Sequence, residues 1–183
     1  MKFVHIADVH WGMSPDSDKP WSKERSQDIK DTFAKAVAQA GQLEADCLFI
    51  SGDLFHRQPL ARDLKDVNYL FSTIPGVHVV IIAGNHDRIR NNSALLSFTW
   101  APNVTYLMDE ELRCVYFEEI NTEVYGFSYH TTDIPENRLD HLTVPNNGRI
   151  HGLLRPGGDA NNTPFAKGAM GALDLSNIAM GHI

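Results

Sequence analysis

Polar side chains that can bind a metal ion or move a proton follow directly after four apolar segments of the chain. In "VVIIAGNHDR", residues 79–88, five apolar residues run straight into Gly84, Asn85, His86 and Asp87. The segments "FVHIA", "CLFI" and "NIAM" also lead into such residues. The side chains in these positions are Asp8, His10, Asp53, His56, Asn85, His86, Asp87 and His182. Carboxylate, imidazole and amide donors suit manganese, iron or zinc. No cysteine belongs to this set of side chains, which disfavours a structural zinc site.

Asp53 follows a buried segment at a point where one carboxylate could bridge two metal ions. Paired ions about 3.5–4 Å apart hold the attacking and leaving oxygens of an in-line displacement at phosphorus. The residues therefore indicate metal-dependent hydrolysis of a phosphoester. Each residue alone also has a structural interpretation, as a helix cap, a turn residue or a buried histidine. The hypothesis depends on their common placement after strands.

The elements that position these residues follow from the hydrophobic pattern. Apolar runs predict strands over 2–7, 47–50 and 77–83, and apolar residues at helical spacing predict helices over 26–43 and 60–74. Strands that alternate with helices are typical of a parallel sheet. Because the carboxyl ends of such strands face one crevice, we expect the polar residues to converge there.

The pattern changes after residue 100. Short segments at 104–107, 112–117 and 123–129 predict strands of a second sheet, followed by a strand over 148–155, a short helix over 164–173 and a last strand over 177–180. No internal repeat or linker divides the chain. The sequence predicts one α/β domain over residues 1–183.

Composition excludes several classes of protein. The 183 residues are 43% hydrophobic and carry a net charge of −7, which argues against an overall basic surface for nucleic acid. A nuclease is still allowed, because bound divalent cations supply local positive charge. No apolar run is long enough to cross a bilayer and no signal peptide is recognisable. Cys47 and Cys114 are expected to be reduced, and a cytoplasmic location is predicted.

The motifs DxH, GD, GNHD and a terminal GH, in this order, resemble those of the calcineurin-like metallophosphoesterases. The longer segments "KFVHIADVHWG", "SGDLFHRQ" and "AGNHDR" resemble the branch of SbcD-type DNA repair exonucleases. The resemblance implies an α/β fold with a two-sheet, β-sandwich-like core flanked by helices. It also implies a phosphodiesterase of the double-strand-break-repair type, acting as an exonuclease or endonuclease on DNA.

The resemblance further implies a role for each residue. Asp8 and His10 would bind the first metal, Asp53 would bridge both metals, and Asn85 and His182 would bind the second. His86 would stabilise the scissile phosphate or protonate the leaving oxygen, with Asp87 orienting its ring. His56 would contact the phosphate or nucleotide. The implied cofactors are two divalent ions, manganese first, with iron, zinc or magnesium as alternatives. The implied partners are DNA, an SMC-like coiled-coil ATPase subunit and a second copy of the chain, and no membrane.

Two departures from the family pattern affect the metal site. Family members carry a ligand histidine in a stretch like "LLAHGGD", and Pro156 stands at that position here. His151 lies five residues earlier in the strand and is interpreted as a strand histidine. The family pattern ends GHxH, whereas this chain stops at Ile183, so the domain is expected to be incomplete at its C-terminus. These departures keep two alternatives open: a small-molecule phosphoesterase, and a non-catalytic relative with an impaired metal site.

Overall fold

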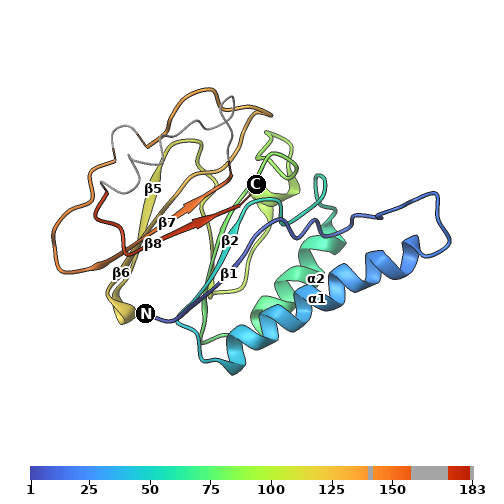
Figure 1. Cartoon of the computed structure of the whole chain (residues 1–183), viewed down its shortest axis with the longest axis horizontal. Helices are drawn as coiled ribbons and strands as arrows, with labels where there is room; N and C mark the ends of the chain where they lie inside the picture. The colour runs from blue at the N-terminus through green and yellow to red at the C-terminus, as the bar shows by residue number, and fades with distance from the viewer. Residues whose placement is uncertain (140–141, 158–172, 182–183) are drawn as a thin grey trace.

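The computed structural model describes residues 1–139, 142–157 and 173–181. Within them the strands form two four-stranded sheets (Figure 1). The first sheet holds β1 (Phe3–Ile6), β2 (Cys47–Ser51), β3 (His78–Ile82) and β4 (Val104–Tyr106), all parallel. The second holds β5 (Arg113–Phe117), β6 (Thr122–Gly126), β7 (Ile150–Arg155) and β8 (Asn177–Met180). Among the described strands of this sheet, only the β5–β6 pair is antiparallel.

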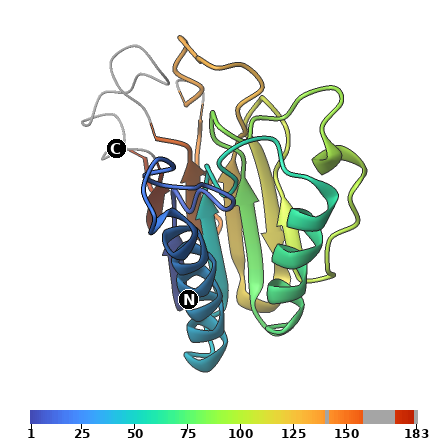
Figure 2. The ribbon, with the colours of Figure 1, turned by 90° about the vertical axis from the view of Figure 1, so that its right-hand side faces the viewer.

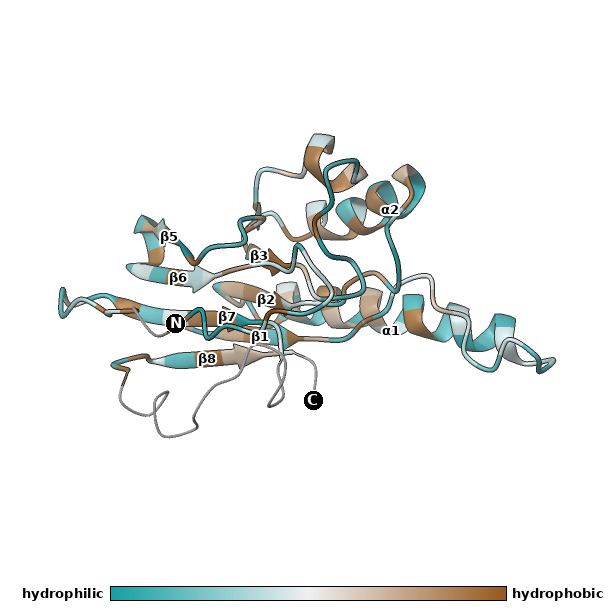
Figure 3. Ribbon diagram, turned by 90° about the horizontal axis from the view of Figure 1, so that it is seen from above, coloured by the Kyte–Doolittle hydropathy of each residue, from teal (hydrophilic) through white to brown (hydrophobic). Residues whose placement is uncertain are grey.

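The two-residue period of the strands distributes the apolar side chains over two cores. Phe49 of β2 and Val80 of β3 point to the second sheet and pack there with Leu154 of β7. Their neighbours Leu48 and Val79 point to the opposite face of the first sheet. Because both faces of the first sheet are covered, its central strands are apolar throughout. Figure 3 shows these apolar strands between the more polar outer elements.

Helices α1 (Ser22–Gln42) and α2 (Ala61–Ser72) cover the outer face of the first sheet (Figure 2). Phe33 of α1 and Phe71 of α2 meet edge to face, with ring centroids 6.0 Å apart, above the strands. Two short 3-10 helices, η1 (Ala94–Ser97) and η2 (Glu118–Ile120), complete the regular structure of the described residues. This is the α/β fold with a two-sheet core that the sequence predicted.

One strand belongs to a different sheet from the one expected. Val104–Tyr106 was predicted with the second sheet, but β4 pairs in parallel with β3 and extends the first. The helix expected over 164–173 falls almost wholly on residues 158–172, outside the described residues. No helix in the described part of the chain has the length and apolar character needed to cross a bilayer.

Candidate metal centre

The loops that follow β1 and β2 run side by side and continue the ladder beyond both strands. The backbone N–H of His10 donates to the Asp53 carbonyl at 2.9 Å, and that of Trp11 donates to the Leu54 carbonyl at 2.8 Å. The N–H of His56 returns a bond to the Trp11 carbonyl at 3.1 Å. The first two sequence motifs are therefore fixed to each other through their backbones.

Asp8, His10 and Asp53 of these loops have, like Asp16, a backbone conformation that residues other than glycine rarely adopt. The φ angles of Asp8, His10 and Asp53 are 53°, 52° and 50°, in the left-handed region. Such conformations cost about 1–3 kcal/mol each and persist where the surrounding structure holds them, commonly at functional sites. All three were predicted as metal ligands from the sequence.

Carboxylates connect the loop after β2 to the turn after β3. Oδ1 of Asp53 accepts a bond from the backbone N–H of His86 at 3.0 Å. In return, the carboxylate of Asp87 accepts bonds from the N–H of Gly84 at 2.8 Å and of Phe55 at 3.1 Å. Asp53 therefore holds the turn after β3, and Asp87 holds both that turn and the loop after β2.

The glycine of the GNHD turn is required by this close approach. A Cβ at Gly84 would lie 2.2 Å from Oδ1 of Asp53 and 2.6 Å from the Asp53 backbone nitrogen. Any larger residue would push the Asp53 carboxylate away from the turn. Gly84 therefore allows Asp53 and His86 to share one site.

Asp8, His10 and Asp53 form a group that could hold a metal ion. One ligand atom from each lies within 4.8 Å of the other two. Asp53 is 1% exposed, whereas Asp8 is open to solvent, so the group lies at the surface of the core. Two carboxylates and an imidazole suit divalent ions such as manganese, iron, zinc or magnesium. The residues present fit the metal that the sequence motifs imply.

His10 also belongs to a second group, with His56 and His86. One ring nitrogen from each histidine lies within 4.8 Å of the others, and the Nδ1 atoms of His10 and His56 are 3.5 Å apart. The rings of His56 and His86 are stacked, with centroids 5.2 Å apart. The sequence predicted His56 at the margin of the site, where it would contact substrate. The structure gives it direct contact with two of the other predicted residues.

The ring of His86 has a defined tautomer. Its Nδ1 lies 3.0 Å from the backbone carbonyl oxygen of His56, and because a carbonyl only accepts, Nδ1 must carry the proton. The lone pair of neutral His86 is therefore on Nε2. The expectation that Asp87 orients this ring is wrong: the His56 carbonyl holds His86, and Asp87 holds the backbones of Gly84 and Phe55.

Burial and neighbouring charges shift two ionisable groups of the site. Complete burial raises the pKa of Asp87 to about 7, against the lowering effect of the N–H group of Phe55. Burial also lowers the pKa of His56, and the neighbouring His10 and His86 lower it further. Both shifts favour the uncharged form of the side chain. A bound cation would act on Asp87 in the opposite direction.

The remaining predicted residues have different outcomes. Asn85 precedes His86 in the same turn and is half-buried, and its role as a ligand of a second metal stays a prediction. His182 lies outside the described residues. Gly181, just before it, packs so closely that a Cβ there would lie 1.8 Å from the Ser51 carbonyl oxygen. The end of β8 therefore meets the end of β2.

Ser51 is a supporting residue that the sequence analysis missed. It is buried at the end of β2, and its hydroxyl donates to the Ala179 carbonyl of β8 at 3.1 Å. Nε2 of His5 lies 3.0 Å from the same hydroxyl. Ser51 thus connects both sheets directly beneath the metal centre. The sequence feature that could have identified Ser51 is a hydroxyl side chain at the end of an otherwise apolar strand.

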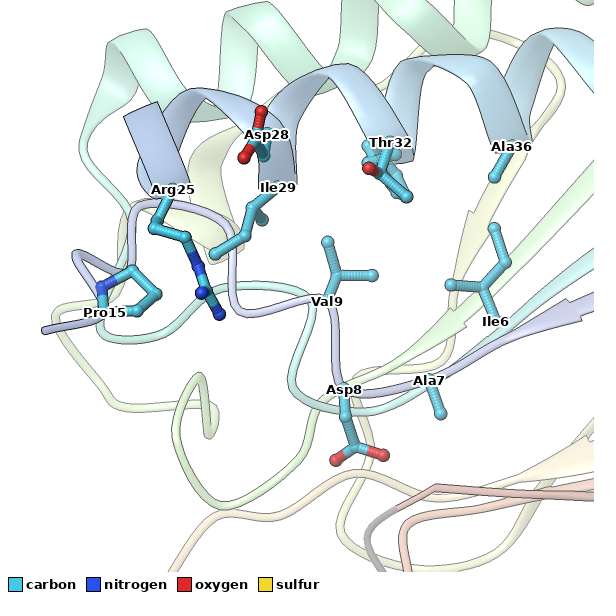
Figure 4. A pocket seen from close by; sticks show the side chains of 11 residues that line it. Ile6, Ala7, Asp8, Val9, Pro15, Arg25, Asp28, Ile29, Thr32 and Ala36 are labelled. Atoms are coloured by element: carbon cyan, nitrogen blue, oxygen red, sulfur yellow. The ribbon is translucent and has the colours of Figure 1, made fainter. Parts of the chain in front are cut away.

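An open groove of about 580 Å³ lies beside the centre, between α1 and the end of β1 (Figure 4). Ile6 and Val9 point across it toward Ile29 and Thr32 of α1. The carboxylate of Asp8 points to the opposite side of the β1 connection in the same view. The groove therefore borders the metal centre, and Asp8 belongs both to its lining and to the donor group.

The chain belongs to the calcineurin-like phosphoesterase family, whose model matches residues 1–174. The predicted family, the phosphoesterase class and the two-sheet fold are confirmed. Membership implies divalent metal ions, which agrees with the donors described above.

Within this class, the chain is similar to several curated DNA double-strand break repair proteins called Mre11. That of Archaeoglobus fulgidus is 37% identical over 92 residues, covering 48% of this chain and 20% of that protein. That of Halobacterium salinarum is 26% identical over 166 residues, covering 85% and 40%. That of Methanocaldococcus jannaschii is 29% identical over 146 residues, covering 78% and 38%. The chain thus spans well under half the length of these relatives.

Proposed function

We propose that this chain is a metal-dependent phosphodiesterase that hydrolyses DNA, with manganese as its preferred ion. The observation that carries the proposal is the convergence of Asp8, His10 and Asp53, with ligand atoms within 4.8 Å of one another, beside His86. Membership in the calcineurin-like phosphoesterase family supports the reaction class. The relatives named for DNA double-strand break repair support DNA as the substrate class.

In this proposal Asp8 and His10 would hold one ion, Asp53 would be shared by the two ions, and Asn85 and His182 would hold the second. Divalent ions at such a site polarise phosphoryl oxygens and lower the pKa of water. Manganese is our first choice because carboxylate and imidazole donors are combined without a thiolate, and iron, zinc or magnesium are the alternatives that the same donors allow. The acidic surface of the chain is compatible with DNA if these ions supply the local positive charge.

His86 acts on the reacting phosphate in this proposal. Because the His56 carbonyl holds the proton on Nδ1, only Nε2 can face the substrate. As an imidazolium, His86 donates a hydrogen bond from Nε2 and can release that proton to the leaving oxygen. Asp87 serves as a positioning residue that keeps the turn in place through Gly84. His56 contacts the phosphate or the nucleotide beside it.

Pro156 favours a second candidate function, a relative with an impaired metal site that hydrolyses slowly or not at all. It directly follows β7, where the family pattern has a ligand histidine, and a proline side chain offers no donor. A non-catalytic chain of this kind would serve as a binding or assembly module.

The experiment measures hydrolysis of bis(p-nitrophenyl) phosphate by the purified chain with added Mn²⁺, with Asp53→Asn as the matched inactive variant. We expect manganese-dependent turnover in the wild type only. Equal rates in both proteins would attribute the hydrolysis to a contaminant, and no turnover in either would favour the non-catalytic relative.

End-labelled single- and double-stranded DNA then identifies the substrate class. Cleavage of DNA supports the proposal. Turnover of the small diester without cleavage of either DNA would favour a small-molecule phosphoesterase.

A further inference from the structure

The His10, His56 and His86 cluster has the geometry of a site for an ion that prefers imidazole. Two nitrogens bound to one tetrahedral zinc ion at 2.0–2.1 Å lie about 3.3 Å apart. The Nδ1 atoms of His10 and His56 are 3.5 Å apart, close to that separation. The third imidazole contributes a ring nitrogen within 4.8 Å of the other two.

The hydrogen bond of His86 is an independent indication of a metal ligand. A histidine that binds metal commonly donates its other ring N–H to a carbonyl or carboxylate, which fixes the tautomer and the ring orientation. His86 makes this bond, from Nδ1 to the His56 carbonyl at 3.0 Å. Its Nε2 is thereby prepared to bind a cation.

We propose that His10, His56 and His86 form a second metal site, selective for zinc and chemically similar ions, that competes with the carboxylate site. All three donors are imidazoles, which suit Zn²⁺, Ni²⁺ and Cu²⁺ better than Mn²⁺. His10 belongs to both groups. Because a neutral imidazole has one nitrogen lone pair available to a metal ion, His10 cannot bind an ion in each site at once. Zinc in the histidine site therefore displaces manganese from the carboxylate site. It also withdraws His86 from any contact with a phosphate.

The inference uses residues of the proposed function, but its test measures metal binding and needs no hydrolysis. Metal-free chain is titrated with Zn²⁺ against a chromophoric chelator and with Mn²⁺ by electron paramagnetic resonance. We expect His56→Ala to lower Zn²⁺ affinity by more than the roughly 10–100-fold that loss of an outer-shell partner of a ligand costs, while Mn²⁺ affinity changes little. Asp8→Asn is the matched opposite variant, because it removes an exposed carboxylate from the manganese group only.

Two further measurements complete the design. Zn²⁺ added to manganese-loaded wild type should release Mn²⁺, and it should release less from His56→Ala. Co²⁺ should give the visible absorption of a nitrogen-rich, low-coordinate site in the wild type and lose it in His56→Ala. Circular dichroism establishes that each variant is folded, and His56→Gln replaces His56→Ala if the latter is not.

The inference would be overturned if Asp8→Asn lowered the Zn²⁺ affinity and His56→Ala left it unchanged, because zinc would then occupy the carboxylate site. Simultaneous binding of both ions at full affinity would refute the competition through His10. Either result stands whether or not the chain hydrolyses a phosphodiester. A failure of the inference is therefore distinguishable from a failure of the proposed function.

Discussion

Two of the regions in the described part of the chain where histidine and carboxylate side chains meet have different surroundings. In the metal centre, His10 and Asp53 lie past the ends of β1 and β2 on left-handed backbone. In the second sheet, Glu123 of β6 and His151 of β7 are direct partners in a regular parallel ladder, and Nδ1 of His151 lies 3.2 Å from Oε2 of Glu123. The same residue types therefore occur in strained loops in one region and in ordinary strands in the other.

In the second region, the carboxylate of Glu123 is engaged in hydrogen bonds with other side chains of the protein. Glu123 accepts hydrogen bonds from the Tyr125 hydroxyl at 2.8 Å, from Nδ2 of Asn147 at 3.3 Å and from the Arg149 guanidinium. A carboxylate with these donors stabilises the sheet and has little remaining capacity for a cation. Residue type alone does not define a metal site; placement after a strand end and backbone strain distinguish the first region.

The largest effect is expected from a substitution that disrupts the metal centre and leaves the second sheet unchanged. Asp53→Asn keeps an oxygen that can accept the His86 N–H, but it removes the negative charge and the proposed bridging ligand. We expect metal-dependent turnover to fall by about 10³-fold or more, because the Lewis-acid contribution is several kcal/mol. Calorimetric titration with Mn²⁺ should show the loss of binding as well.

Glu123→Gln is the matched control, since it makes the same change from carboxylate to amide beside a histidine of the second region. It should leave Mn²⁺ binding and turnover unchanged. A loss of manganese binding in Glu123→Gln equal to that in Asp53→Asn would remove the distinction between the regions.

The next largest effect is expected from His86→Asn, which separates manganese binding from catalysis in the metal centre. His86→Asn preserves a side-chain N–H near the position of Nδ1, which can still reach the His56 carbonyl, but it removes Nε2. Turnover should fall by about 10²–10⁴-fold, the usual contribution of a general acid or base. Manganese affinity in calorimetry should stay near that of the wild type. Release of manganese to the extent seen in Asp53→Asn would make His86 a manganese ligand and refute its assigned role at the phosphate.

A smaller effect tests the packing of the two turns. Gly84→Ala places a methyl group against the Asp53 carboxylate and should cost about 1–3 kcal/mol of stability in urea denaturation, as overpacking does. Gly76→Ala is the control, because a Cβ there has no atom within 4 Å. Equal stabilities of the two variants would show that the approach of Asp53 to Gly84 is not constrained.

The smallest effect concerns the pH dependence of the second region. Burial alone would raise the pKa of Glu123, but hydrogen bonds from Tyr125 and Arg149 outweigh it and hold the pKa below its usual range. Because the folded pKa lies below the unfolded value, this stabilisation is present above the unfolded pKa and is lost as the pH falls through the folded pKa. Glu123→Gln should therefore show a flatter dependence of urea stability on pH than the wild type in the acidic range. Identical slopes would contradict this assignment.

Much of the fold was predictable because buried parallel strands carry a strong local signal. The segments Cys47–Ser51 and His78–Ile82 are apolar on both faces, so their position and type followed from sequence alone. The sheet membership of Val104–Tyr106 was not predictable, because a three-residue strand carries no information about its partner. Only its pairing with β3 determines the sheet.

The candidate site was predictable as a set of residues and only partly as a set of contacts. Asp8, His10 and Asp53 could be grouped because all follow strand ends. The partner of the His86 ring could not be predicted, because it is a backbone carbonyl and every residue has one. The role of Ser51 depends on a contact with β8 across more than a hundred residues of chain.

The most direct test of the metal centre is anomalous diffraction from a crystal of the chain grown with Mn²⁺. The account predicts an anomalous peak within bonding distance of Asp8, His10 and Asp53, at the carboxyl ends of β1 and β2. A manganese peak beside Glu123 and His151, or none at the edge of the first sheet in a manganese-saturated crystal, would contradict it.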